Sequence, residues 1–204
     1  MENNVILVPP HVENMQLPAP ELLNFYKALE DRVYWLSDEI NTFTLELIQY
    51  ILRWNKEDIG KPVEERKPIK ILFFCNGGDL EVYRSIADII SLSQTPIYGI
   101  VIGTAYSAAG MIFLSCHKRF MLRSSVVLFH RGSGQISGGF NEVYAAMTEY
   151  HAQVEEMIEE VSQRTNYTRE ECEERMTTDW YVRADEALEH GVCDKIITNI
   201  EEIL

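Results

Sequence analysis

Apolar segments that end in glycine or histidine alternate with segments of helical periodicity along the middle of this chain. Three segments have the composition of buried strands: 69–74, 97–102 and 126–129. Apolar residues at helical spacing predict helices beside them: 82–92, 107–116 and about 141–164. Strands that alternate with helices indicate βαβ units, so we expect an α/β fold with a mostly parallel sheet covered on both faces.

The remaining segments are assigned in the same way. The predicted helices are 21–30, 41–54, 168–176 and 184–190, and the predicted strands are 32–37 and 192–198. Four of the seven prolines fall within residues 1–20, which predicts an N-terminal arm outside the core. Charged residues, Gly60 and two prolines make 55–68 a solvated connection. We find no internal repeat, and 204 residues are expected to form a single domain.

The composition excludes several classes of partner. The chain has 18 Lys and Arg against 32 Asp and Glu, a formal net charge of −14. This surplus disfavours nucleic acid and anionic membranes, which are bound through clustered Lys and Arg. Glycines and polar residues interrupt the longest apolar region, 97–114, and the N-terminus has no basic leader. The four cysteines form no C-x-x-C pair, so we expect reduced thiols in a cytoplasmic protein without metal or cofactor.

A serine follows the second predicted buried strand, in the segment Gly103-Thr104-Ala105-Tyr106-Ser107-Ala108-Ala109-Gly110. Small residues flank Ser107 at a strand-to-helix turn, where free backbone N–H groups favour a developing anion. A serine hydroxyl becomes a nucleophile once a base takes its proton. A helix N-cap is an equally ordinary role for this serine, so the segment alone leaves both roles open. The segment resembles the G-x-S-x-G elbow of hydrolases without matching it.

Two other strand ends carry residues of possible chemical use. His130 ends the third predicted strand, and it is the one of five histidines at such a position. It fits a base at the edge of the sheet or a buried core residue. Gly77 and Gly78 follow the first strand, where they fit a simple turn or a backbone that donates an N–H to an oxyanion. Because ligands of parallel sheets bind at the carboxyl ends of strands, we expect these residues at the functional edge.

In this order, these features resemble the proteolytic subunit of the Clp protease, the ClpP family. The family has a strand ending in Ser-Pro-Gly-Gly, a Gly-x-Ala-x-Ser turn, a strand ending in His, and an Asp after a long helix. The matching segments are Cys75-Asn76-Gly77-Gly78, Gly103-Thr104-Ala105-Tyr106-Ser107, Val127-Leu128-Phe129-His130 and Thr178-Asp179-Trp180-Tyr181. The segment 184–194 is similar to the closing segment of the family, and the resemblance runs from about 32 to 197.

The resemblance implies a serine endopeptidase with a ClpP/crotonase-like fold and no cofactor. Ser107 would be the nucleophile, His130 the general base and then acid, and Asp179 the residue that orients His130. The backbone N–H groups of Gly78 and Ala108 would form the oxyanion hole. The residues implied to bind substrate are Gly77, Asp79, Leu80, Gly132 and Ser133.

The resemblance also implies an assembly and partners. Residues of about 132–164 match the place of the family's projecting handle, which packs between two heptameric rings. The expected substrate is unfolded polypeptide inside the barrel, and an AAA+ unfoldase would be a further partner. Two other functions stay open. A catalytically silent ClpP-like subunit is one, although it has no chemical reason to keep all three triad residues. A crotonase-type acyl-CoA enzyme is the other, for which an acid near the glycines, Asp79, is the supporting feature.

Overall fold

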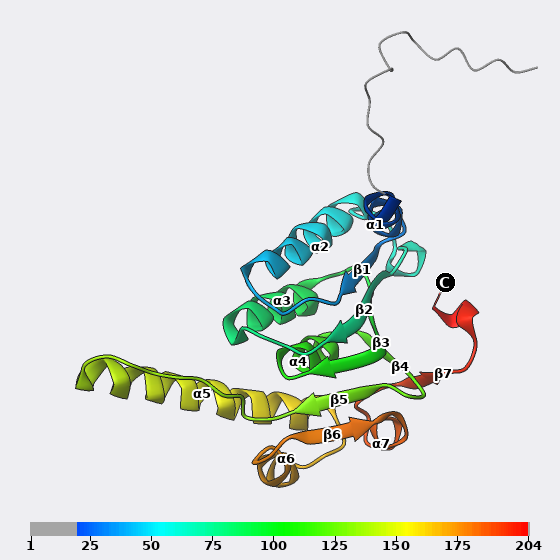
Figure 1. Ribbon diagram of the computed structural model, residues 1–204. Helices are drawn as coiled ribbons and strands as arrows, with labels where there is room; N and C mark the ends of the chain where they lie inside the picture. Colours follow the sequence, from blue (N-terminus) through cyan, green and yellow to red (C-terminus); the bar gives the residue numbers. More distant parts are fainter. Residues whose placement is uncertain (1–19, 204) are drawn as a thin grey trace, which may run out of the picture. The chain divides into compact units, whose positions relative to one another are not determined.

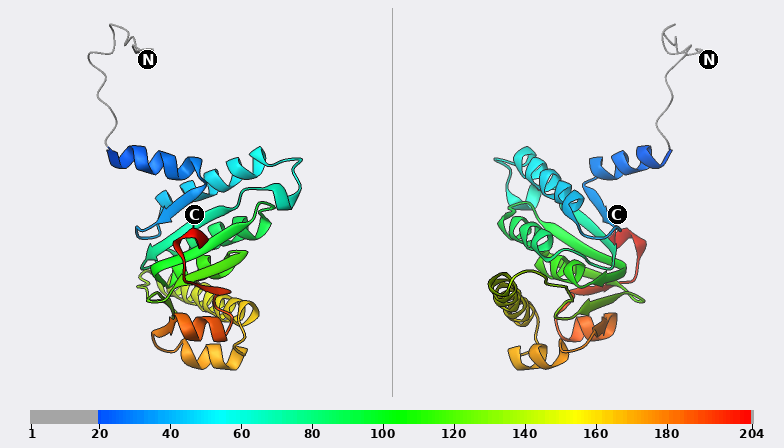
Figure 2. Two further views of the ribbon diagram at one scale, coloured as in Figure 1. Left: turned by 90° about the vertical axis from the view of Figure 1, so that its right-hand side faces the viewer. Right: turned by 60° about the vertical axis from the view of Figure 1, so that its left-hand side comes forward.

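The computed structural model describes residues 20–203 of the chain (Figures 1 and 2). It divides into two compact units, residues 1–31 and 32–204, which are described separately. The described part of the first unit contains the helix α1 (Pro20–Glu30), which agrees with the helix predicted over 21–30. The N-terminal arm expected over 1–20 lies outside the described residues, except for Pro20, and the single domain expected over 1–204 stays a prediction.

The second unit is built on a seven-stranded sheet. Its strands are β1 (Val33–Leu36), β2 (Ile69–Cys75), β3 (Ile97–Tyr106), β4 (Lys118–Leu122), β5 (Val126–Phe129), β6 (Trp180–Arg183) and β7 (Lys195–Ile197). Its α-helices are α2 (Glu46–Glu57), α3 (Leu80–Leu92), α4 (Ala108–Ser115), α5 (Phe140–Arg164), α6 (Arg169–Arg175) and α7 (Ala184–Glu189). Three short 3₁₀ segments complete it: η2 (Thr42–Leu45), η3 (Val63–Glu65) and η4 (Ile200–Glu202).

Along one of its edges, β3 pairs first with β4 and then with β5. Its first part pairs with β4 through residues 98–101, and its last part pairs with β5 through 104–106. The prediction that this strand ends at Gly103 was wrong, because the strand continues to Tyr106. Gly103 leaves room for a neighbouring ring: a Cβ there would lie 2.3 Å from Cδ2 of Phe74. The glycine therefore serves packing inside the strand and does not end it.

The sheet is mostly parallel, as predicted. The pairs β1–β2, β2–β3, β3–β4, β3–β5 and β4–β7 are parallel, and β5–β6 is antiparallel. Two of these strands, β4 and β6, were not predicted. Both are short: β4 begins with two basic residues, Lys118 and Arg119, and β6 exposes Tyr181 and Arg183 at alternate positions, so neither has a long apolar run.

Helices α2, α3 and α4 lie along one face of the sheet (Figure 1). The other face, seen in the left view of Figure 2, is crossed by the C-terminal segment. There Ile197 joins Leu72 and Ile100 in a buried cluster. Trp35 and Phe74 remain about half exposed. The expectation of a sheet covered on both faces is therefore met only in part, because no α-helix of residues 32–203 covers this second face, where only the C-terminal segment with η4 lies.

A buried ion-pair network closes the edge of the sheet where the strands begin. Asp58, whose side chain is fully buried, accepts hydrogen bonds from Arg32 Nη1 (2.5 Å), Arg32 Nη2 (3.1 Å), Lys61 Nζ (2.7 Å) and Thr95 Oγ1 (3.0 Å). The hydrogen bonds from Arg32 hold the pKa of Asp58 far below its ordinary value. Arg32 also donates to the carbonyl of Lys67 (2.9 Å). The network thus ties the starts of β1, β2 and β3 together.

The helix α5 projects beyond the body of this unit, in the place of the expected handle (Figure 1). Its second half packs on the body through Val154, Met157, Ile158 and Val161, which are buried. Its first half exposes apolar side chains, and Phe140 is 84% exposed. Apolar residues of this helix therefore divide into an internal set and an exposed set. None of the helices in the described part is long and apolar enough to cross a membrane.

Candidate active site

Ser107 stands between the end of β3 and the start of α4. Its backbone is left-handed, with φ 54° and ψ −124°. Main-chain hydrogen bonds hold this conformation: Ser107 N–H donates to the Leu128 carbonyl (2.9 Å), and the Ser107 carbonyl accepts from Met111 N–H (3.1 Å). The side chain makes no capping hydrogen bond to α4, although Ser107 occupies the N-cap position. The hydroxyl is therefore available for a contact outside the helix.

The Ser107 hydroxyl contacts a histidine, and the histidine contacts a carboxylate. His130 Nε2 lies 2.8 Å from Ser107 Oγ, and His130 Nδ1 lies 3.1 Å from Asp179 Oδ1. With its proton on Nδ1, His130 donates to Asp179 and leaves Nε2 free to accept from the Ser107 hydroxyl. The structure thus brings together the three residues that the family resemblance selects, from three separate segments of the chain.

The antiparallel pairing of β5 with β6 sets the distance between His130 and Asp179. In its register Phe129 is opposite Trp180, so the next pair outward is His130 opposite Asp179. The ring centroids of Phe129 and Trp180 are 5.6 Å apart, and Tyr167 packs edge-on against Trp180 at 4.7 Å. Since Trp180 is buried, these aromatic contacts anchor the backbone that carries the carboxylate.

Of the two glycines after β2, Gly77 lies directly against Ser107, and Gly78 lies against the main chain of Ile40. A Cβ on Gly77 would lie 2.6 Å from the Tyr106 carbonyl oxygen and 2.8 Å from Ser107 Cβ, so no side chain fits there. Ile40 fixes this segment as a short parallel bridge, since Ile40 N–H donates to the Gly77 carbonyl (2.8 Å) and the Ile40 carbonyl accepts from Asp79 N–H (2.9 Å). This pairing directs the N–H and the carbonyl of Gly78 away from Ile40, to the other side of the segment.

Two backbone N–H groups beside Ser107 are suited to an anion. The N–H of Ala108 belongs to the first turn of α4, where no carbonyl of the helix can accept it. The N–H of Gly78 points away from the bridge to Ile40. In the part of the chain that the structure describes, neither group donates to a backbone carbonyl. The arrangement can bind a negative oxygen next to the serine.

The other predicted substrate residues surround these groups. Asp79 caps α3, since its Oδ1 accepts from Glu81 N–H (2.8 Å) and Val82 N–H (3.0 Å), and Leu80 begins that helix. Gly132 and Ser133 follow His130 on an irregular segment. The capping role of Asp79 explains why an acid lies beside the glycines. This acid therefore gives no support to a crotonase-type acyl-CoA enzyme. The role of these residues in substrate binding stays a prediction.

Sequence reasoning missed the residues that hold the site through their main chains. Ile40 and Leu128 contribute a carbonyl or an N–H, and residue type carries no signal for such a contact. It also assigned no role to the aromatic pair beside the nucleophile, Tyr106 and Tyr181, whose rings meet edge-on at 5.8 Å. The register of β3, β5 and β6 places these two rings on either side of Leu128.

The cysteine thiols are not activated as nucleophiles, since burial raises the pKa of each of the four. The thiol of Cys75 lies at the end of β2 beside the glycines, and burial raises its pKa, which keeps it protonated. All four cysteines are buried and free of disulfides. Among residues 20–203, no group of three or more His, Cys, Asp or Glu side chains is placed to hold a metal ion.

Comparisons with known proteins support the same family. The family model described as Clp protease matches residues 21–200. The ATP-dependent Clp protease proteolytic subunit of Porphyromonas gingivalis is 27% identical over 192 residues, which cover 93% of this chain and 84% of that protein. Subunit 2 from Treponema pallidum is 27% identical over 179 residues, covering 87% of each.

Among solved structures, a mutant of ClpP1 from Listeria monocytogenes superimposes with a TM-score of 0.75, at 22% identity, over 89% of this chain and 99% of that one. This match confirms the predicted α/β fold of the ClpP/crotonase-like type. The family resemblance drawn from the strand ends is likewise confirmed, because the family model covers most of the chain. The chain belongs to the Clp protease family.

Proposed function

We propose that this chain is a serine endopeptidase subunit that hydrolyses peptide bonds of unfolded polypeptides. The observation that carries the proposal is the continuous hydrogen-bonded series from Ser107 through His130 to Asp179. In other serine hydrolases a series of this kind raises the nucleophilicity of the hydroxyl. The two N–H groups beside it, on Gly78 and Ala108, supply the complementary anion site.

The reaction follows from these positions. His130 Nε2 takes the hydroxyl proton as Ser107 Oγ attacks the peptide carbonyl carbon, and Asp179 stabilises the imidazolium that forms. The carbonyl oxygen becomes negative and accepts from the N–H groups of Gly78 and Ala108. His130 then gives the proton to the leaving amine, which breaks the peptide bond and leaves an acyl group on Ser107. Water, deprotonated by His130, releases the acyl group as a carboxylic acid.

We further propose that the subunit works in a homo-oligomer of stacked heptameric rings in the cytoplasm, with an AAA+ unfoldase as its partner. The exposed apolar side chains on the first half of α5, Phe140, Tyr144 and Met147, support a contact between copies at the handle. The names of the two bacterial relatives, ATP-dependent Clp protease proteolytic subunits, are consistent with this arrangement.

Labelling with a fluorophosphonate tests the catalytic proposal. Wild-type protein should gain one adduct by intact mass, mapped to Ser107, and the Ser107→Ala variant should gain none. An adduct on another serine, such as Ser85, Ser115 or Ser133, would contradict the assignment. A catalytically silent subunit or an acyl-CoA enzyme predicts no adduct at all. Light scattering of the same sample tests the assembly, and a monomeric mass would contradict it.

A further inference from the structure

A cavity of about 350 Å³ opens between the start of α3, the irregular segment after His130 and the first half of α5. Three of its lining residues are apolar or carry an apolar ring, Ile136, Ala146 and Tyr150. Two lining residues are carboxylates, Glu81 and Glu149. The cavity therefore combines apolar walls with negative charge.

Two walls of the cavity are formed by segments that follow site residues in the sequence. One segment follows Gly78, whose N–H would bind the reacting carbonyl, and the other follows His130. Glu81 lies three residues beyond Gly78, in the first turn of α3. On the opposite wall, the Tyr150 hydroxyl donates to the carbonyl of Arg131 (2.7 Å), the residue that follows His130. A peptide whose carbonyl oxygen lies at Gly78 carries its side chain one bond away from that carbonyl. The cavity is thus placed to receive the side chain on the amino side of the cleaved bond.

The two carboxylates of the cavity, Glu81 and Glu149, have no cationic partner in the part of the chain that the structure describes. Within residues 20–203, no Lys, Arg or His forms an ion pair with Glu81 or Glu149. The nearest cation along α3, Arg84, is one turn further on and is paired with Glu156. Glu149 Oε1 accepts a hydrogen bond from Gln153 Nε2 (3.1 Å), which is neutral.

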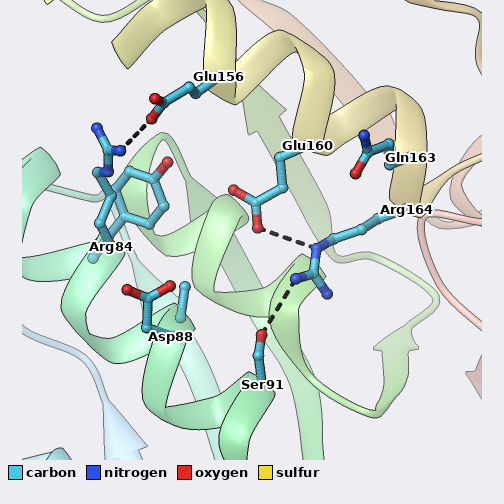
Figure 3. Close-up of a pocket in the computed structure, with 9 residues that line it drawn as sticks. Arg84, Asp88, Ser91, Glu156, Glu160, Gln163 and Arg164 are labelled. Carbon is cyan, nitrogen blue, oxygen red and sulfur yellow. Dashed lines mark hydrogen bonds and ion pairs between the residues drawn. The ribbon is translucent and has the colours of Figure 1, made fainter.

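A second cavity between the same two helices shows the opposite arrangement (Figure 3). It measures about 290 Å³, and two of the three carboxylates that line it, Glu156 and Glu160, are paired inside the protein. Glu156 pairs with Arg84, and Glu160 Oε1 lies 3.1 Å from Arg164 Nε. The dashed contacts of Figure 3 show that the Arg84–Glu156 pair spans α3 and α5, whereas Arg164, which pairs with Glu160 of its own helix, reaches Ser91 of α3. Two acids of the second cavity are thus paired, whereas among the described residues Glu81 and Glu149 of the first cavity have no cationic partner.

We propose that the cavity beside the triad binds the substrate residue whose carbonyl is attacked, and that Glu81 and Glu149 make it selective for lysine or arginine. This inference rests on the proposed peptidase function. The aliphatic stem of a long cationic side chain can pack on Ile136 and Tyr150 while its head donates hydrogen bonds to the carboxylates. An acidic residue at this position of the substrate would be repelled.

Peptide substrates that differ at one position test the inference. The position before the cleaved bond carries lysine, norleucine or glutamate, since norleucine keeps the length of the stem and removes the charge. With wild-type protein, kcat/KM for lysine should exceed that for norleucine about tenfold or more. The ratio should fall towards one in the Glu81→Gln/Glu149→Gln double variant, and it should decline as ionic strength rises.

Asp88→Asn is the matched control. Asp88 lies on α3 and lines the second cavity, so the variant removes the same charge from the same helix without changing the cavity beside the triad. Its lysine-to-norleucine ratio should equal that of wild type. A wild-type ratio of one or less, or an unchanged ratio in the double variant, overturns the inference while Ser107 is still labelled. Failure of the proposed function differs: no peptide is cleaved and Ser107 gains no adduct, and the inference falls with it.

Discussion

Arg32 and Ser107 are the non-glycine residues with a left-handed backbone in the described part of the chain, and they lie at opposite ends of the parallel sheet. Arg32 (φ 59°) precedes β1, at the edge where strands begin, and Ser107 (φ 54°) follows β3, at the edge where strands end. A non-glycine residue in this region costs about 1–3 kcal/mol. The surrounding structure offsets that cost in different ways at the two ends.

The polar groups around Arg32 form hydrogen bonds and ion pairs with one another. Its guanidinium is 8% exposed and bonds the fully buried Asp58 twice, along with the Lys67 carbonyl. At Ser107 main-chain hydrogen bonds hold the conformation, and the hydroxyl contacts His130. The edge at Arg32 is thus saturated, because its polar side chains pair with one another, whereas the edge at Ser107 is unsaturated, because the N–H groups of Gly78 and Ala108 donate to no backbone carbonyl among the described residues.

Ser107→Ala should give the largest effect, and it tests whether the unsaturated edge is reactive. Turnover of a peptide substrate should fall by about 10⁶-fold, by analogy with other triads, because no atom remains to form the acyl bond. The free energy of unfolding in urea should change by no more than about 1 kcal/mol, since the hydroxyl does not cap α4. Retention of activity would place the nucleophile elsewhere.

Asp179→Asn should have the next largest effect. An amide favours the wrong imidazole tautomer of His130, so turnover should fall by about 10⁴-fold while the fold is preserved. The Asp179→Asn/His130→Ala double variant should have a turnover only slightly below that of His130→Ala alone, because the three residues act as a unit. Asp185→Asn, an exposed carboxylate at the start of α7, serves as the control and should leave turnover unchanged. Additive losses in the double variant would separate Asp179 from the triad.

Asp58→Ala tests the saturated edge. It leaves the buried Arg32 charge without its main partner, so the free energy of unfolding should fall by about 3–5 kcal/mol. Arg53→Ala, which removes an exposed ion pair with Glu57, should cost less than about 1 kcal/mol. Urea unfolding of both variants measures the difference. Equal losses in the two variants would show that the network at Asp58 is no stronger than a surface pair.

Acid should weaken the same edge by a smaller amount. Since the pKa of Asp58 is held well below its ordinary value of 3.8, the network stabilises the fold above that pH and loses its contribution as the pH falls. Each pH unit below the ordinary pKa removes up to about 1.4 kcal/mol. The stability advantage of wild type over Asp58→Asn, measured in urea between pH 6 and pH 3, should therefore shrink below about pH 4. An advantage that stays constant to pH 3 would contradict this.

The sequence predicts the reactive edge better than the carboxylate that completes it. Gly77, Ser107 and His130 each end or follow an apolar strand, so strand periodicity alone brings them to one edge. Asp179 reaches His130 through the register of β6, a four-residue strand with exposed alternate residues that leaves no apolar run. Family resemblance supplied that residue, because pairing between strands some fifty residues apart is not written in local composition. Local sequence likewise does not show that Glu81 and Glu149 lack a cationic partner among the described residues, because this depends on which carboxylates the nearby arginines pair with.

The pairing of β3 first with β4 and then with β5 has a consequence for the chain during its synthesis. Its last part is joined to β5 and, through β5, to β6, so the carboxylate at residue 179 is added after most of the sheet has been synthesised. A growing chain that has released only the first 170 residues carries the serine and the histidine without their third partner. Because a domain generally folds as a unit, the proposed triad should be complete only after residue 179 has emerged, and an unfinished subunit should be inactive towards its neighbours at the ribosome.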